Sequence, residues 1–127
     1  MFRKLGVILG LATLVAAPAA AGHSLEPTRL VAESGSRFIG YTMRASNRYE
    51  IPALFYVECY YKELGNPQPC TALPRAFNLR SGATRNFRFR IDTEGRDGLY
   101  LICTVYDPRA GTGPQAGIKT RVCARFG

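Results

Sequence analysis

Two apolar segments near the C-terminus constrain the fold most, because each has the length and residue content of a β-strand. Residues 98–106 are rich in aliphatic, aromatic and β-branched side chains, and the turn residues Asp97–Gly98 and Asp107–Pro108 bound them. Residues 118–126 alternate apolar and polar side chains, as a strand does with one face on a core and one in water. Each segment carries one cysteine, so a disulfide could join the pair.

The segments upstream have the same character. They are short, they alternate or run apolar, and turn residues separate them. Beyond the N-terminal leader, no segment of ten or more residues has a helical period. The sequence therefore predicts an all-β protein, an immunoglobulin-like β-sandwich of about seven strands. Its expected strands precede the final two at 30–32, 37–46, 51–62, 70–79 (interrupted by Pro74) and 84–92.

The N-terminus has the pattern of an export signal. A short basic region, Met1–Lys4, precedes an uncharged apolar run, and Pro18–Ala21 offers a small-residue cleavage site. We therefore expect a signal peptide at 1–21 and one domain at 22–127. The apolar run is short for a bilayer, so no stable membrane span is expected after cleavage. The predicted location is the periplasm, or the exterior, of a bacterium.

Four cysteines in a small exported domain predict two disulfides. The pairing closest in sequence is Cys59–Cys70 with Cys103–Cys123, but three connectivities are possible. Side-chain phase argues partly against this pairing, because Cys103 alternates with the apolar Leu101 and so is expected in the core. Cys123 alternates with arginines and is expected to face solvent, whereas a cross-strand bridge needs both cysteines on one face.

Strand faces follow from the same alternation. Residues 84–92 are expected to turn Phe87, Phe89 and Ile91 inward, with Arg88 and Arg90 outward. In the next strand, Leu101 is expected to be buried together with Cys103. The segment 22–27 is expected to be an exposed lead-in.

The mature chain is strongly basic. Without Arg3 and Lys4, the 17 basic residues fall to 15 against 9 acidic ones, which is a net charge of +6. Such a surface could bind anionic lipid, nucleic acid, acidic peptide or a carboxylate terminus. Arg85, Arg88 and Arg90 could form a basic stripe with Arg37 or Arg44, although a solvated outer face would explain them equally well.

Candidate catalytic and metal-binding residues are scarce. The single histidine, His23, lies near the terminus, the carboxylates are scattered, and all four cysteines are expected to be oxidised. His23 could chelate copper with a free amine only if cleavage fell after Gly22, and a second histidine is absent from the sequence. We therefore expect no enzyme activity, no cofactor and no metal site.

Three motifs, at residues 25–31, 77–82 and 97–108, resemble the N-terminal domain of periplasmic pilus chaperones of the chaperone–usher class. Residues 25–31 resemble that family's first strand, residues 77–82 its apolar-x-Leu-x-x-Gly turn, and residues 97–108 its penultimate strand. The resemblance covers one of the family's two domains. The loop at 107–117 lacks the alternating bulky apolar residues that the family inserts into its client.

The resemblance also implies a function and a site. In that family, two basic residues hold the C-terminal carboxylate of a pilus subunit, and the last strand completes the subunit's sheet. These anchors correspond to Arg29 and Arg121, with Lys119 as the alternative to Arg121, and we expect Arg29 and Arg121 to lie close together. The expected partner is a protein or peptide client, bound by β-strand addition.

Two other functions are compatible with the sequence. The arginine-rich face of an envelope or secreted protein could bind anionic lipid or nucleic acid. A secreted inhibitor-like module could present the loop at 107–117.

Overall fold

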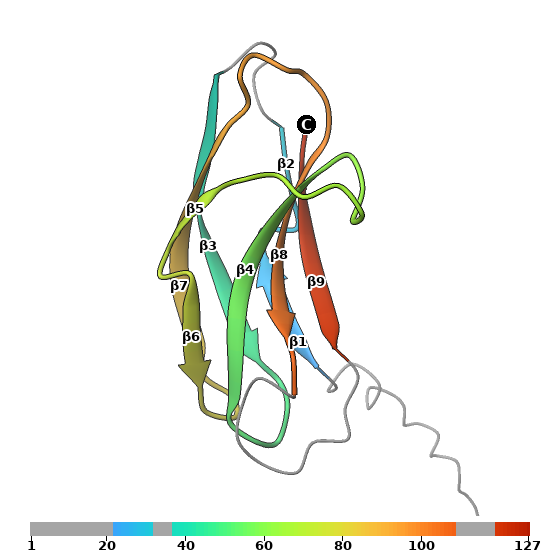
Figure 1. Cartoon of the computed structure of the whole chain (residues 1–127). Helices are drawn as coiled ribbons and strands as arrows, with labels where there is room; N and C mark the ends of the chain where they lie inside the picture. The colour runs from blue at the N-terminus through green and yellow to red at the C-terminus, as the bar shows by residue number, and fades with distance from the viewer. Residues whose placement is uncertain (1–21, 32–36, 109–118) are drawn as a thin grey trace, which may run out of the picture.

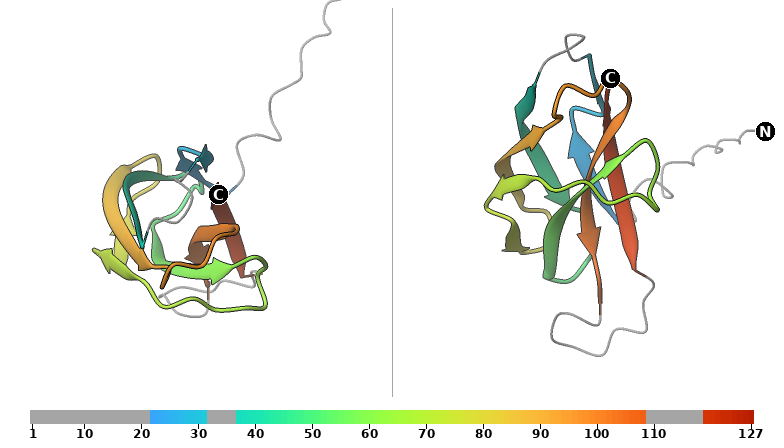
Figure 2. Two further views of the ribbon diagram at one scale, coloured as in Figure 1. Left: turned by 90° about the horizontal axis from the view of Figure 1, so that it is seen from above. Right: turned by 45° about the horizontal axis from the view of Figure 1, so that its top comes forward.

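The computed structural model describes residues 22–31, 37–108 and 119–127. The expected signal peptide and most of the loop at 107–117 lie outside these ranges. The described residues form nine strands in two facing sheets, confirming the predicted β-sandwich (Figure 1; Figure 2, left). The strands are β1 His23–Glu26, β2 Arg29–Leu30, β3 Phe38–Asn47, β4 Ala53–Tyr61, β5 Thr71–Leu73, β6 Ala76–Leu79, β7 Thr84–Asp92, β8 Tyr100–Tyr106 and β9 Thr120–Phe126.

Sheet A has four strands in the order β1-β3-β7-β5, and sheet B has five in the order β2-β9-β8-β4-β6. Neighbouring strands are antiparallel except β2, which runs parallel to β9. Both β1 and β2, at the N-terminal end of the chain, therefore lie at sheet edges.

The chain passes from one sheet to the other at two points that contain a proline. The chain leaves sheet A after β1 and joins sheet B as β2, and it crosses again between β5 and β6. Pro27 and Pro74 lie at these crossings. Proline has no N–H to donate to a ladder, so it ends pairing in one sheet and frees the chain to reach the other. About seven expected strands become nine because the expected strand 70–79 is divided into β5 and β6, and because β1 forms in the segment expected to be an exposed lead-in.

The core lies between the sheets and contains several aromatic side chains. Phe55, Phe87 and Phe126 are almost fully buried, and Phe89 meets Phe126 edge-on with 4.9 Å between ring centroids. The inward set predicted for β7 is confirmed, with Arg88 and Arg90 exposed on the opposite face. This packing holds sheets A and B face to face.

The faces predicted for β8 are wrong. Ile102 pairs with the core residue Cys59 and belongs to the core, whereas Leu101 and Cys103 point to the outer face of sheet B. Alternation could not decide the face, because both sides of β8 are apolar. Cys103 is still fully buried.

The exposed lead-in predicted at 22–27 is also wrong. Residues 23–26 form β1, and His23 and Leu25 are buried against the core. A four-residue strand with a histidine at an inward position gives little periodic signal.

Both disulfides of the sequence-local pairing are present, Cys59–Cys70 and Cys103–Cys123, and no cysteine is free. Cys103 and Cys123 are directly opposite on neighbouring strands, with 4.0 Å between their Cα atoms. The phase conflict disappears because Cys103 shares the outer face with Cys123. The other bridge joins β4 of sheet B to the residue before β5 of sheet A.

Candidate functional site

The C-terminal strand β9 carries the predicted basic residues and an incompletely paired edge. One edge of β9 pairs with β8 along its length. The opposite edge pairs only with the two residues of β2, at Arg125 and Phe126. Among the described strands, none pairs with residues 121–124 on that side. β1 lies near β9 but pairs with β3 alone. Backbone N–H and C=O groups of such an edge can accept an additional strand.

Arg121 lies on the outer face of sheet B and contacts β4. Its Nε donates hydrogen bonds to Glu58 Oε1 (3.3 Å) and to the Tyr60 hydroxyl (3.2 Å), and Tyr60 donates to Glu58. Because β8 runs between β4 and β9, these contacts pass over Cys103, which explains its burial. The terminal nitrogens of Arg121 make no hydrogen bond within the described part of the chain.

The charges in this cluster are mutually stabilised. Burial, together with its hydrogen bond to Glu58, raises the pKa of Tyr60, which keeps the hydroxyl protonated. The hydrogen bond to Tyr60 raises the pKa of Arg121. Lys119 lies nearby, with its Nζ 5.9 Å from the centre of the Tyr56 ring. Among the described residues, Arg121 is therefore a cation with one carboxylate partner, Glu58.

Arg29 lies at the other end of this face. It pairs in register with Arg125, and both are exposed, whereas Leu30 packs against the core and Phe126 is buried. Arg125 N donates to Thr28 O at 3.0 Å, which ties the two segments together. Arg121 precedes Arg125 by four residues, about 13 Å along a strand. Close approach of the Arg29 and Arg121 guanidinium groups therefore stays a prediction.

Sequence reasoning missed Arg125. The alternation that places Arg121 outward also places Arg125 outward, so the signal was present. The sequence could not predict the register between β2 and β9, because a parallel pairing of only two residues produces no periodic pattern.

A shallow hollow of about 640 Å³ lies where the chain crosses from β1 to β2. Arg29 and Glu26 line it from the crossing, and Tyr41 and Arg44 line it from β3. Tyr41 has an inward phase but is 49% exposed. β1 pairs with β3 only at residues 44–47, so the edge of β3 beside Tyr41 has no neighbouring strand among the described residues. The hollow therefore opens at the edge of sheet A, beside Arg29 of β2.

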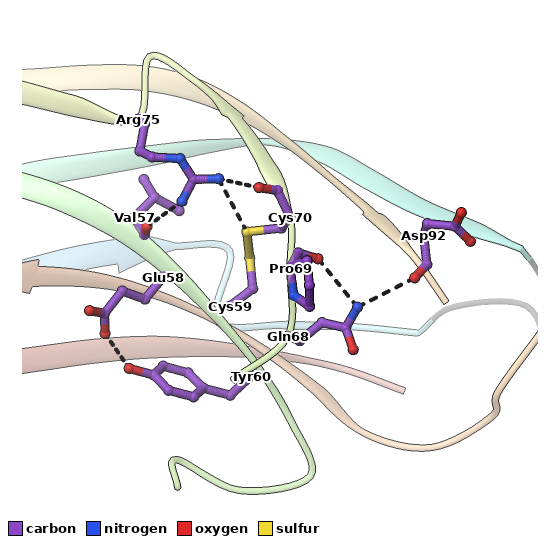
Figure 3. Close-up of a disulfide and its surroundings, with 9 residues drawn as sticks. All are labelled: Val57, Glu58, Cys59, Tyr60, Gln68, Pro69, Cys70, Arg75 and Asp92. Carbon is purple, nitrogen blue, oxygen red and sulfur yellow. Dashed lines mark hydrogen bonds between the residues drawn. A yellow bond between two sulfur atoms is a disulfide. The ribbon is translucent and has the colours of Figure 1, made fainter. Parts of the chain in front are cut away.

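Figure 3 shows the Cys59–Cys70 disulfide beside the second crossing of the chain. Arg75 folds back over it: Nη1 donates to Val57 O at 3.0 Å, Nη2 donates to Cys70 O, and Nη2 lies 3.9 Å from Cys70 Sγ. Gln68 Nε2 bridges Pro69 O and Asp92 O. These contacts hold the two sheets together.

His23 is buried, and its ring contacts sheet B. Its Nε2 donates to Thr104 O at 3.1 Å, and its ring lies 4.8 Å from that of Phe55. The described residues hold no group of three or more His, Cys, Asp or Glu side chains that could share a metal ion. Within the same ranges, no helix has the length and apolarity to cross a bilayer.

Comparisons with solved structures identify the fold. The Escherichia coli chaperone DraB aligns with a TM-score of 0.63 and 23% identity, over 83% of this chain and 53% of its own. A chain of the Salmonella enterica SafA pilin–SafB chaperone complex aligns with a TM-score of 0.61 and 18% identity, over 91% of this chain and 55% of its own. The Caenorhabditis elegans MSP family member WR4 aligns with a TM-score of 0.56 and 13% identity, over 82% of this chain and 94% of its own.

The chain thus has the fold of the immunoglobulin-like domain found in pilus chaperones, and it spans about half the length of the chaperone chains it matches. The MSP match shows that this sandwich is not confined to chaperones. No protein-family model and no curated protein sequence matches.

Proposed function

We propose that this is an exported, non-enzymatic, chaperone-like protein that binds a protein or peptide client by β-strand addition along β9. Basic residues beside that strand, Arg29 and Arg121 with Lys119, would hold acidic groups or the terminal carboxylate of the client. The observation that carries the proposal is the edge of β9 at residues 121–124, which has no strand partner among the described residues. Backbone pairing there would supply affinity.

The chemistry of the basic residues fits this role. Arg121 uses only Nε for its described contacts with Glu58 and Tyr60, so its terminal nitrogens can donate to a second carboxylate. Arg29 and Arg125 carry two further guanidinium groups on the same face. The structural neighbours are also compatible, because their names include a chaperone in complex with a pilin.

The experiment separates backbone pairing from charge. The probe is a synthetic seven-residue peptide of alternating valine and threonine with a free C-terminal carboxylate, titrated into the isotopically labelled protein. Saturable NMR shifts of the amides at 121–124 are expected. A peptide with alternate backbone nitrogens methylated should not bind, because it cannot form the ladder.

The carboxylate arm uses an amidated peptide and two variants. Arg29→Ala and Arg121→Ala should each weaken binding of the free-acid peptide about tenfold and leave binding of the amidated peptide unchanged. Arg80→Ala is the matched control, because Arg80 follows β6 at the far edge of sheet B. Equal binding of methylated and unmethylated peptides would disprove strand addition, and equal binding of acid and amide would disprove the anchor.

A further inference from the structure

The outer face of sheet A carries a second basic site, separate from β9. Arg90 on β7 lies between Gly40 of β3 and Thr71 of β5, and Arg88 lies between Thr42 and Leu73 in the neighbouring row. Neither arginine forms an ion pair within the described part of the chain. The basic stripe predicted from the sequence also included Arg85. In β7, Arg85 has the opposite phase to Arg88 and Arg90, so it does not lie on the same face as they do.

The Arg90 guanidinium is held in place by an aromatic ring. Its Cζ lies 4.0 Å from the centre of the Phe38 ring, a distance typical of stacking. In a stacked guanidinium, the N–H groups at the edge of the plane remain free to donate hydrogen bonds. Two of these N–H groups can donate in parallel to the two oxygens of a carboxylate. The stacking therefore restricts the conformations of the Arg90 side chain before a ligand binds.

The space in front of this arginine is a hollow of about 570 Å³. Gly40 is part of its lining, and a Cβ at that position would lie 3.0 Å from Phe89 O, so the close backbone packing disfavours a larger residue. Phe38 and Leu73 form apolar walls and are 46% and 69% exposed. The hollow thus combines two cations with apolar surface.

The charges around the hollow favour a single carboxylate over an extended polyanion. The neighbouring cation Arg37 is already paired with Asp92 through two hydrogen bonds of 3.1 Å. That contact lowers the pKa of Asp92, which keeps it negatively charged. Glu26 occupies the same face beside Arg44. Asp92 and Glu26 flank the two arginines, so the basic area is short, and a membrane surface or a nucleic acid would gain few contacts from it.

We propose that the hollow over Gly40 binds an acidic side chain of a partner protein, with Arg90 as the bidentate ligand and Arg88 as a second cation. The apolar residues beside that acidic residue would rest on Phe38 and Leu73. This site is independent of strand addition at β9, so either proposal can fail without the other.

The test uses a peptide with no terminal charge. Acetylated and amidated Ala-Leu-Glu-Leu-Ala is titrated into the labelled, oxidised protein, alongside its glutamine counterpart. The glutamate peptide should produce saturable shifts at the amides of Gly40, Thr42 and Thr71, and the glutamine peptide should bind at least about tenfold more weakly. Equal effects of the two peptides would overturn the proposal.

Two substitutions separate planar recognition from charge. Arg90→Met keeps a long side chain against Phe38 and should raise Kd at least about tenfold. Arg90→Lys keeps the charge but not the fork, and should lie between Arg90→Met and the unaltered protein. Arg85→Met is the matched control on the same strand and should not change Kd. Unchanged binding by Arg90→Met would overturn the assignment.

Two further probes address other anions. Inorganic phosphate should shift the same amides only at higher concentration than the glutamate peptide. Vesicles of phosphatidylglycerol should not sediment the protein in an Arg90-dependent manner. Tighter phosphate binding, or Arg90-dependent sedimentation, would replace the carboxylate with a phosphate or a membrane surface as the ligand.

Discussion

Asn47 and His23 are both buried polar residues, and the fold satisfies them unequally. Asn47 Nδ2 donates to Ile51 O and Leu79 O, each at 2.9 Å, and Oδ1 accepts from Tyr49 N at 2.8 Å. His23 forms one hydrogen bond, to Thr104 O, while its Nδ1 has no partner within the described residues. A buried histidine in this setting is stable only when neutral, because a second N–H would lack an acceptor.

His23 therefore makes stability depend on pH. Burial lowers its pKa below the ordinary value of 6.5, so the unfolded chain binds a proton more readily than the folded one. As pH falls below 6.5, the free energy of unfolding should decrease, by at most about 1.4 kcal/mol per pH unit from this group. Urea unfolding between pH 7.5 and 5.5 measures the slope.

The control is His23→Phe, which keeps an aromatic ring against Phe55 but cannot titrate. Its unfolding free energy should be lower at pH 7.5, because the hydrogen bond from the His23 ring to Thr104 O is lost, and should change less with pH. If both proteins showed the same slope, another group would be responsible for the pH dependence.

At the scale of elements, the sequence predicts most strands, but it predicts their faces only where one side of the strand is polar. β7 shows a clean alternation, so Phe87 and Arg88 are placed correctly. β8 lies between β9 and β4 with apolar residues on both sides, and only its register with β4 reveals that Ile102 faces the core. In the candidate site, Arg121 points outward, as the alternation of its strand predicts. The pairing of Arg29 with Arg125 could not be predicted, because it depends on the register between two strands.

Alanine substitutions on β8 test its faces. Ile102→Ala should lower the free energy of unfolding by about 2–5 kcal/mol, because it empties a fully buried core position. Leu101→Ala should cost clearly less, because Leu101 is only half-buried, on the outer face opposite Tyr60 and Arg125. Chemical denaturation of the oxidised proteins gives both values. A larger loss for Leu101→Ala would mean that β8 presents the opposite face to the core.

At the scale of the whole molecule, the two disulfides have different mechanical roles. Cys103–Cys123 joins adjacent strands of sheet B that backbone hydrogen bonds already hold together. Cys59–Cys70 joins sheet B to sheet A. β5 follows it immediately, has three residues, and pairs with β7 alone. The bridge between the sheets therefore secures the most weakly held strand of sheet A.

Removing each bridge should cost a similar amount globally but open different regions. The closed loops span 11 and 20 residues, so loss of either disulfide should reduce the free energy of unfolding by about 2–4 kcal/mol. Hydrogen exchange distinguishes them, because it reports local opening. In Cys59→Ala/Cys70→Ala, residues 62–73 should exchange faster while β8 and β9 keep their protection relative to global unfolding. In Cys103→Ala/Cys123→Ala, β5 should keep its protection. If Cys59→Ala/Cys70→Ala left residues 62–73 as protected as before, Arg75 and Gln68 would suffice to hold the sheets together.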